Sequence, residues 1–212
     1  MEWITNILFA ISNSLLIPVI LLLIIFFVWS LIRAGGFYSE FTIRRKYLQK
    51  LSPLLDKIGK GEAEVEDFAT ALPDKDYALV LHYYREVLRY GANADSAEYA
   101  ISCYENCMTK ELITPRLFTK IGPILGLMGT LISMSPALTG LATGDIAGMA
   151  YNMQVVFATT VVGLVISAIG LITLLYKQRW YTHDSDNLLY LSRIIQERSY
   201  HAAEEQQRKE GE

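Results

Sequence analysis

Charged side chains are almost absent from two long stretches of this sequence. Residues 1–32 and 121–176 contain no lysine, arginine or histidine, and their only acids are Glu2 and Asp145. Over the whole chain 52% of residues are hydrophobic and only 19% are charged, against about 25% charged in an average soluble protein. Such segregation of charge is typical of a protein that crosses a membrane. The mean hydropathy of +0.26 also excludes a disordered chain.

Other absences narrow the range of functions. A net charge of -3 leaves no large basic surface, so we expect no nucleic-acid partner. Cys103 and Cys107 lack the CxxC spacing and have no nearby histidine, so we predict no zinc site and no disulfide framework, and we interpret both as reduced thiols. The sequence has no Gly-rich phosphate loop and no Ser/His/Asp constellation. We therefore predict that the chain is not an enzyme and uses neither a metal nor a cofactor.

Three apolar stretches are long enough to span a bilayer, whose core of about 30 Å needs roughly 20 helical residues. They predict transmembrane helices at residues 7–32, 121–141 and 150–176. The first stretch lacks the basic n-region and the cleavage site of a signal peptide, so we expect it to be retained. The predicted fold class is an all-α membrane protein with three transmembrane helices and long cytoplasmic helical extensions.

The basic residues that flank these spans all mark one side of the membrane. Arg33 follows the first span, Lys120 precedes the second and Lys177 follows the third, which places this side in the cytoplasm by the positive-inside rule. The N-terminus then lies outside. Asp145, the lone acid of the outward loop, either attracts cations or caps the third span, and we favour the cap. The remaining segments are the outward loop (142–149), the cytoplasmic helical region that leads into the second span (33–120) and the cytoplasmic helical tail (177–212).

Within the cytoplasmic region, apolar residues recur at helical spacing in four patterns separated by proline or glycine. Ser52-Pro53 predicts a helix start or a kink inside the first pattern. The fourth pattern leads directly into the second span, so we expect long helices that project from the membrane. The four patterns are Phe41–Lys60, Glu62–Leu72, Asp76–Tyr90 and Asp95–Lys120.

An α-helix turns by about 100° per residue. With that geometry, small residues form one stripe along the second span and another along the third. Small side chains let a second helix backbone approach closely, which stabilises helix pairs in a membrane. We therefore predict two packing faces that meet each other or a common partner. The second-span stripe is Gly122, Gly126, Gly129, Ser133, Ala137 and Gly140, and the third-span stripe is Asn152, Val156, Thr159, Gly163, Ser167 and Gly170.

Four hydroxyl groups lie at similar depth in or beside these stripes, on Thr130, Ser133, Thr159 and Thr160. A single threonine in a membrane helix often bonds only a carbonyl of its own helix. Four hydroxyl groups at a similar depth predict either a channel lining or a docking surface for a polar group. Hydroxyls cannot store a proton, whereas proton relays ordinarily use ionisable groups. If the protein conducts protons, another chain must supply the titrating carboxylate.

The segment Pro123–Leu171 resembles the ExbB/TolQ/MotA family of proton-channel and motor subunits. Residues 126–130 read GLMGT and fit the family pattern G-L-x-G-T, while residues 160–164 read TVVGL and fit T-x-x-G-L. The three-span layout with an outside N-terminus is closest to ExbB and TolQ. Those proteins commonly carry a glutamate five positions before the second threonine, where this sequence has Val155.

The resemblance implies a homo-oligomeric ring, a pentamer in this family, in the bacterial inner membrane. The ring would enclose two copies of a single-span ExbD/TolR/MotB-like partner whose transmembrane Asp faces Thr130 and Thr160. Its implied function is to convert a proton- or sodium-motive force into mechanical work, as a motor or stator subunit serving protein transport, an envelope process or motility. The competing interpretation is a non-conducting oligomeric membrane scaffold that recruits cytoplasmic proteins.

Overall fold

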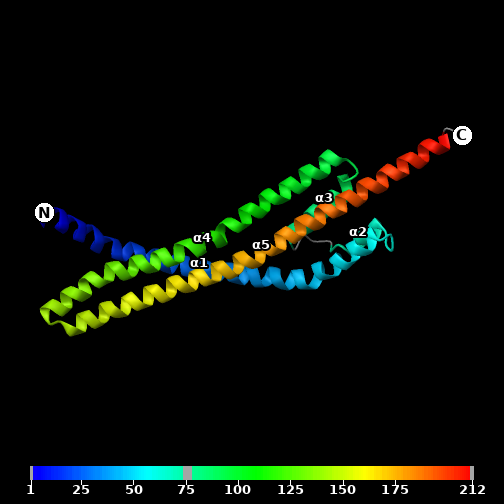
Figure 1. Ribbon diagram of the computed structural model, residues 1–212. Helices are drawn as coiled ribbons and strands as arrows, with labels where there is room; N and C mark the ends of the chain where they lie inside the picture. The colour runs from blue at the N-terminus through cyan, green and yellow to red at the C-terminus, as the bar shows by residue number, and fades with distance from the viewer. Residues whose placement is uncertain (1, 74–77, 211–212) are drawn as a thin grey trace. The chain divides into compact units, whose positions relative to one another are not determined.

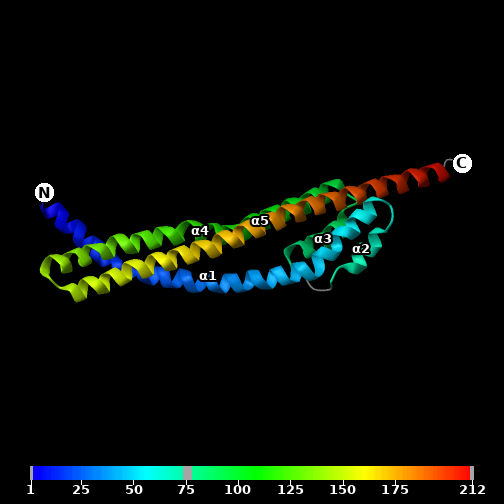
Figure 2. The same cartoon turned by 60° about the horizontal axis from the view of Figure 1, so that its bottom comes forward.

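A computed structural model describes residues 2–73 and 78–210 of the chain. These residues form α-helices and no strand, which confirms the expected all-α fold (Figures 1 and 2). Helices α1, α4 and α5 are each long and apolar enough to cross a membrane, which agrees with the three predicted spans. The expected start of a helix near Asp76 lies outside the described residues. The helices are α1 (Glu2–Gly59), α2 (Val65–Ala71), α3 (Leu79–Tyr90), α4 (Ala94–Thr143) and α5 (Ile146–Glu210).

No helix starts at Ser52-Pro53, because α1 runs through both residues to Gly59, and the alternative of a kink there stays a prediction. Proline lacks the N–H that an interior helical residue donates, so an isolated helix would be weakened here. In the structure, Leu51 and Leu55 on either side of Pro53 are only 2% and 1% exposed. Burial of this face holds the helix together across the missing hydrogen bond.

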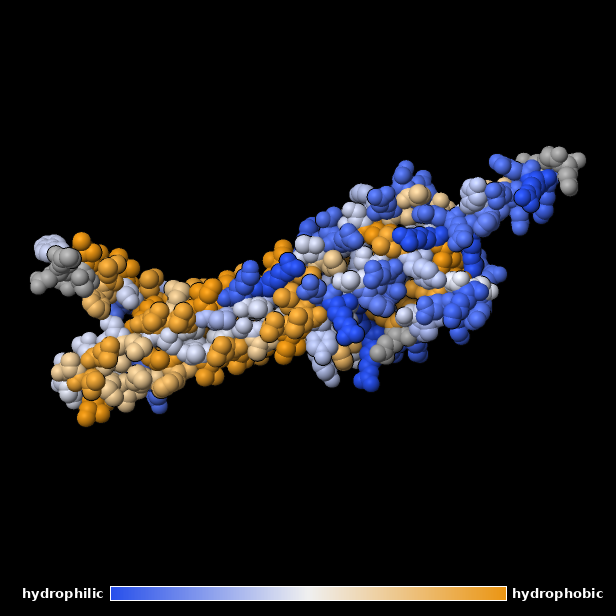
Figure 3. Space-filling view, in the orientation of Figure 1, coloured by the Kyte–Doolittle hydropathy of each residue, from blue (hydrophilic) through white to orange (hydrophobic). Residues whose placement is uncertain are grey.

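The chain divides into two units that differ in surface chemistry. We call residues 1–35 and 112–175 the apolar unit, and residues 36–111 and 176–212 the polar unit. On the face drawn in Figure 3, hydrophobic residues cover most of the apolar unit, and most of the strongly hydrophilic residues lie on the polar unit. The predicted spans fall almost entirely within the apolar unit, as expected for a segment that faces lipid.

The apolar unit has a core to which α1, α4 and α5 all contribute. Leu23 of α1, Phe118 and Leu125 of α4 and Ile166 of α5 form one buried cluster. Aromatic rings extend this cluster, since Trp29 and Phe118 pack edge-to-face with ring centroids 5.1 Å apart. Edge-to-face contacts of this kind add about 0.5–1.5 kcal/mol beyond the area that they bury. These contacts hold α1 against the pair formed by α4 and α5.

The polar unit is built around the short helix α3, whose sequence is strongly amphipathic. Its buried side chains recur three or four residues apart, as one face of a helix requires. Phe68 of α2 and Tyr104 of α4 are also fully buried in this unit, and Phe68 packs edge-to-face with Tyr84 at a centroid distance of 5.2 Å. The buried residues of α3 are Val80, Leu81, Tyr83, Tyr84 and Val87.

Candidate functional site

The two small-residue stripes meet each other within one chain, where α4 and α5 lie side by side (Figure 2). A Cβ atom added to Gly122 would lie 2.6 Å from the carbonyl oxygen of Gly163, and one added to Gly129 would lie 2.7 Å from Cβ of Thr159. At Gly126 the nearest atom would be the carbonyl oxygen of Thr159, at 3.2 Å. Glycine is therefore required wherever the two backbones approach most closely.

The α5 side of this contact shows the same close packing. A Cβ added to Gly170 would lie 2.7 Å from Cβ of Phe118, and the Ser167 hydroxyl donates a hydrogen bond to the carbonyl oxygen of Thr119 at 3.1 Å. On α4, Ala137 is 3% exposed, so it too is covered by neighbouring residues. Gly140 lies at the turn, where an added Cβ would meet the carbonyl oxygen of Asp145 at 3.1 Å.

The four hydroxyls predicted to line a channel fall into two pairs in the structure. Thr159 and Ser133 are buried, at 5% and 0% exposure, whereas Thr130 and Thr160 remain partly exposed. The Ser133 hydroxyl has no hydrogen-bond partner among the described residues. Thr130 and Thr160 are therefore the two hydroxyls of this group that a second chain could reach, and their role as a channel lining stays a prediction.

Each of the threonine hydroxyls donates to its own helix. Thr130 Oγ1 donates to the carbonyl oxygen of Leu127 at 2.7 Å, and Thr160 Oγ1 donates to the carbonyl oxygen of Val156 at 3.0 Å. Thr159 Oγ1 lies 3.0 Å from two such carbonyls. A hydroxyl has one proton to donate and two lone pairs to accept with. The exposed hydroxyls can therefore still accept a hydrogen bond from a partner.

Asp145 caps the start of α5, as the sequence favoured. Its Oδ1 accepts a hydrogen bond from the backbone N–H of Gly148 at 2.9 Å. We expect Asp145→Ala to lower the free energy of unfolding by about 1 kcal/mol, because the N–H loses its acceptor. Asp145→Asn retains an acceptor oxygen and should be nearly neutral. Thermal unfolding of both variants checks this, and an Asn variant with normal stability but reduced ion flux would instead favour cation attraction.

An ion pair that the sequence analysis missed lies in the polar unit. Arg44 of α1 donates from Nη1 to Oδ2 of Asp184 on α5 at 2.7 Å, and the Tyr104 hydroxyl donates to the same oxygen at 3.1 Å. Arg44 is 7% exposed and Asp184 is 4% exposed. Burial raises the pKa of the Asp184 carboxyl, and the two hydrogen bonds oppose that rise. This pair joins two helices far apart in sequence.

Lys177 forms a second ionic contact in the same unit. Its Nζ lies 2.9 Å from Oε2 of Glu40 on α1 and 3.2 Å from Oε2 of Glu111 on α4. Burial alone would lower the pKa of Lys177, but attraction to Glu40 outweighs it and the pKa is raised. Burial, with Glu40 adding to it, also raises the pKa of the neighbouring Tyr181 to about 12. The ammonium therefore stays charged and bridges three helices.

One signal in the sequence could have pointed to the Arg44–Asp184 pair. Asp184 lies on a stripe with Tyr181, Leu188 and Leu191, which are spaced at three to four residues and are all at most 1% exposed. A carboxylate on the apolar face of a helix needs a buried partner, because burying an unpaired charge is very costly. The spacing does not identify that partner.

The family model described as the MotA/TolQ/ExbB proton channel family matches residues 89–188, a range that contains both small-residue stripes. Comparisons with curated proteins and with solved structures give no match. The family-level resemblance found in the sequence is thereby confirmed.

Proposed function

Because this chain carries a domain of the MotA/TolQ/ExbB proton channel family, we propose that it is an ion-channel and motor subunit that converts a proton- or sodium-motive force into mechanical work. In this proposal, copies of the chain form a ring in the bacterial inner membrane, with the N-terminus outside. The ring encloses a single-span partner of the ExbD/TolR/MotB type that carries a transmembrane Asp. Each proton that crosses about 100 mV supplies roughly 2.3 kcal/mol, so several must combine for substantial work.

The observation that carries the proposal is the absence of ionisable groups from the α4–α5 pair at membrane depth. Between residues 121 and 176 the only ionisable acid or base other than tyrosine is Asp145, and its carboxylate already caps α5. A proton path through this pair therefore depends on a carboxylate from elsewhere. The family match supports the ion-channel part of this proposal, since the matching model describes a proton channel family.

The hydrogen bonds of Thr130 and Thr160 suit such a carboxylate in its protonated form. Because both hydroxyls already donate to backbone carbonyls, they meet a partner as acceptors. A neutral carboxyl group has one O–H to donate, whereas a carboxylate can only accept. The proposed partner Asp would therefore be held best when protonated. After it loses the proton, a threonine must rotate to donate to it, which couples proton release to a change in contacts.

The proposal predicts that Thr130→Val and Thr160→Val each reduce ion flux by at least about tenfold, because a hydrogen bond to a charged or titrating group contributes about 1.5–3 kcal/mol. Valine has nearly the same shape as threonine, so the helices should still pack. The measurement is proton or sodium flux into proteoliposomes that contain the chain together with its single-span partner.

Thr139→Val is the matched control, because the exposed Thr139 hydroxyl also bonds its own helix, at 3.1 Å to the carbonyl oxygen of Ser135. It should leave the flux unchanged. Normal flux in the Thr130 and Thr160 variants would overturn their assigned role. If the complex also assembles without any single-span partner and carries no flux, the scaffold is the better description.

A further inference from the structure

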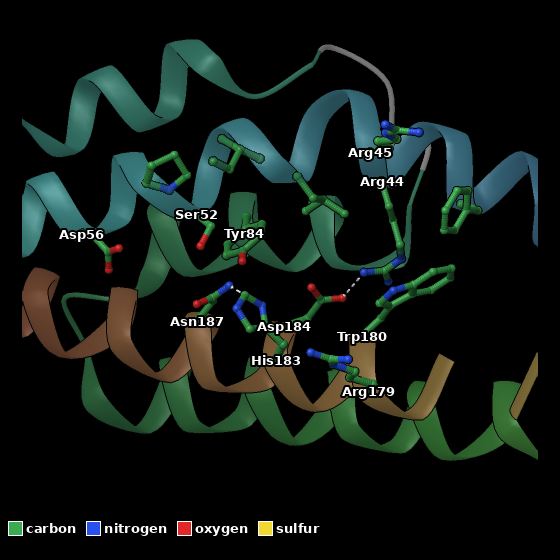
Figure 4. A pocket seen from close by; sticks show the side chains of 14 residues that line it. Arg44, Arg45, Ser52, Asp56, Tyr84, Arg179, Trp180, His183, Asp184 and Asn187 are labelled. Carbon is green, nitrogen blue, oxygen red and sulfur yellow. Dashed lines mark hydrogen bonds and ion pairs between the residues drawn. The ribbon is translucent and has the colours of Figure 1, made fainter. Parts of the chain in front are cut away.

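The polar unit contains a pocket between α1 and α5 that the channel proposal does not use (Figure 4). Its volume is about 800 Å³, within the range of pockets that hold small-molecule ligands. In Figure 4, Arg44, Trp180 and Asp184 converge at one end, Arg179 lies next to them on α5, and Ser52 and Asn187 face each other across the middle. Tyr84 of α3 also lines the pocket, which thus combines polar groups from three helices.

The lining carries an excess of positive charge. Three arginines, Arg44, Arg45 and Arg179, contribute to it, against two aspartates, Asp56 and Asp184. The carboxylate of Asp184 is already paired with Arg44, whereas Arg45 and Arg179 are exposed at the surface. A guanidinium group has a planar set of donors that matches phosphate and carboxylate geometry. This charge pattern favours an anionic ligand.

Arg44 is also incompletely satisfied. Its side chain is 8% exposed, and its Nη2 atom is buried with no hydrogen-bond partner among the described residues. Buried guanidinium N–H groups without an acceptor are unfavourable, and such groups are uncommon in folded proteins. An acceptor oxygen brought in by a ligand would complete the hydrogen bonds of Arg44.

Besides the polar residues Ser52, His183 and Asn187, the remaining lining is apolar or aromatic and can hold a hydrophobic group. Phe41, Leu48, Leu51 and Pro53 of α1 face the pocket together with Trp180 of α5. The Trp180 ring already stacks on Phe37, with centroids 5.4 Å apart, and lies 5.0 Å from the guanidinium carbon of Arg44. A ligand with both an anionic group and an apolar part would satisfy both sides of this pocket.

We propose that this pocket binds the phosphate group of an anionic amphiphile, with Arg179 and Arg45 as its first contacts and Arg44 as the innermost donor. An anionic phospholipid is the favoured source. Arg179 lies three residues beyond Tyr176, the last residue of the predicted third span, and three residues of helix rise by about 5 Å. That depth falls in the headgroup layer, where basic pockets beside membrane helices bind anionic headgroups.

The test uses the full-length chain, purified in mild detergent as the native oligomer with any partner that accompanies it. Native mass spectrometry measures the binding of phosphatidylglycerol and of phosphatidylcholine. We expect the wild type to prefer phosphatidylglycerol, and Arg179→Gln and Arg45→Gln each to weaken that binding by about tenfold, because each removes a charge-assisted hydrogen bond. Both arginines are exposed, so neither variant should disturb folding.

Arg193→Gln is the matched control, since Arg193 is an exposed arginine on the same helix that does not line the pocket. It should bind phosphatidylglycerol as the wild type does. A thermal-shift assay with glycerol 3-phosphate and adenosine monophosphate tests whether the phosphate group comes from a soluble compound instead of a phospholipid. If they stabilise the wild type but not Arg179→Gln while phosphatidylglycerol does not bind, the phosphate site stands and its ligand is soluble.

Equal phosphatidylglycerol binding by the wild type, Arg179→Gln and Arg45→Gln, with no stabilisation by the soluble phosphates, would overturn the proposal. This outcome is independent of the channel assignment, because the pocket contains none of the threonines tested by ion flux. A chain that conducts ions normally and fails this test keeps its proposed function and loses only the phosphate site.

Discussion

Gly163→Ala is expected to lower the apparent melting temperature of the protein by roughly 4–8 °C, which corresponds to about 2 kcal/mol in a chain of this size. The added Cβ would lie 2.5 Å from the carbonyl oxygen of Gly122 and 2.9 Å from Cα of Gly126. Both neighbours are backbone atoms, so no side-chain rotation can make room. The two helices must move apart, and the dispersion contacts along their small-residue faces weaken.

Gly35→Ala makes the same chemical change in open space, because no atom lies within 4 Å of a Cβ added there. Alanine favours the helix over glycine by up to about 1 kcal/mol, so this control should be neutral or slightly stabilising. Thermal unfolding in one detergent compares the two variants directly. Equal melting temperatures for both variants would show that the close approach of α4 and α5 contributes little to stability.

Asp184→Leu should destabilise the protein by about 3 kcal/mol, because Arg44 loses its closest partner and keeps only Glu40, whose Oε1 lies 3.3 Å from Nε of Arg44. It also removes the acceptor of the Tyr104 hydroxyl, which lies 3.1 Å from Oδ2 of Asp184. The expected fall in apparent melting temperature is about 10 °C, measured by thermal unfolding. Lys177 and Glu40 stay in place, so a second ionic contact remains in this unit.

The double variant Arg44→Met, Asp184→Leu should recover most of that loss, because a buried ion pair can often be replaced by apolar residues at little net cost. Asp186→Leu serves as a control at an exposed position on the same helix. A double variant as unstable as Asp184→Leu alone would show that the charge left on Arg44 is not the cause. A stable Asp184→Leu protein would contradict the importance of the pair altogether.

Much of the helical architecture could be predicted from the distribution of charge and apolar residues. The uncharged runs around Leu23 and Ile166 are long enough to span a bilayer, and both residues lie in the buried core of the apolar unit. Tertiary packing decides where a local pattern leaves alternatives open. At Pro53 a local rule predicts a helix start or a kink, and the burial of Leu51 and Leu55 keeps one continuous helix there instead of a new start.

The candidate site was only partly predictable, for a different physical reason. Small residues at helical spacing identified the α4–α5 contact, because packing faces follow the helical period. The helical period does not predict which hydroxyls stay accessible. Thr159 is buried against α4, whereas the neighbouring Thr160 stays partly exposed. Arg44 and Asp184 are 140 positions apart, and no local pattern records such a pairing.

The prolines are unequally divided between α4 and α5, the two helices that the family model matches in whole or in part. Helix α4 contains Pro115, Pro123 and Pro136, and α5 contains none along its 65 residues. Each proline removes one backbone hydrogen bond of the helix, which makes the helix easier to bend at that residue. A force on this pair of helices should therefore bend α4 more easily than α5. Most of the bending would then occur in the helix that contains the prolines.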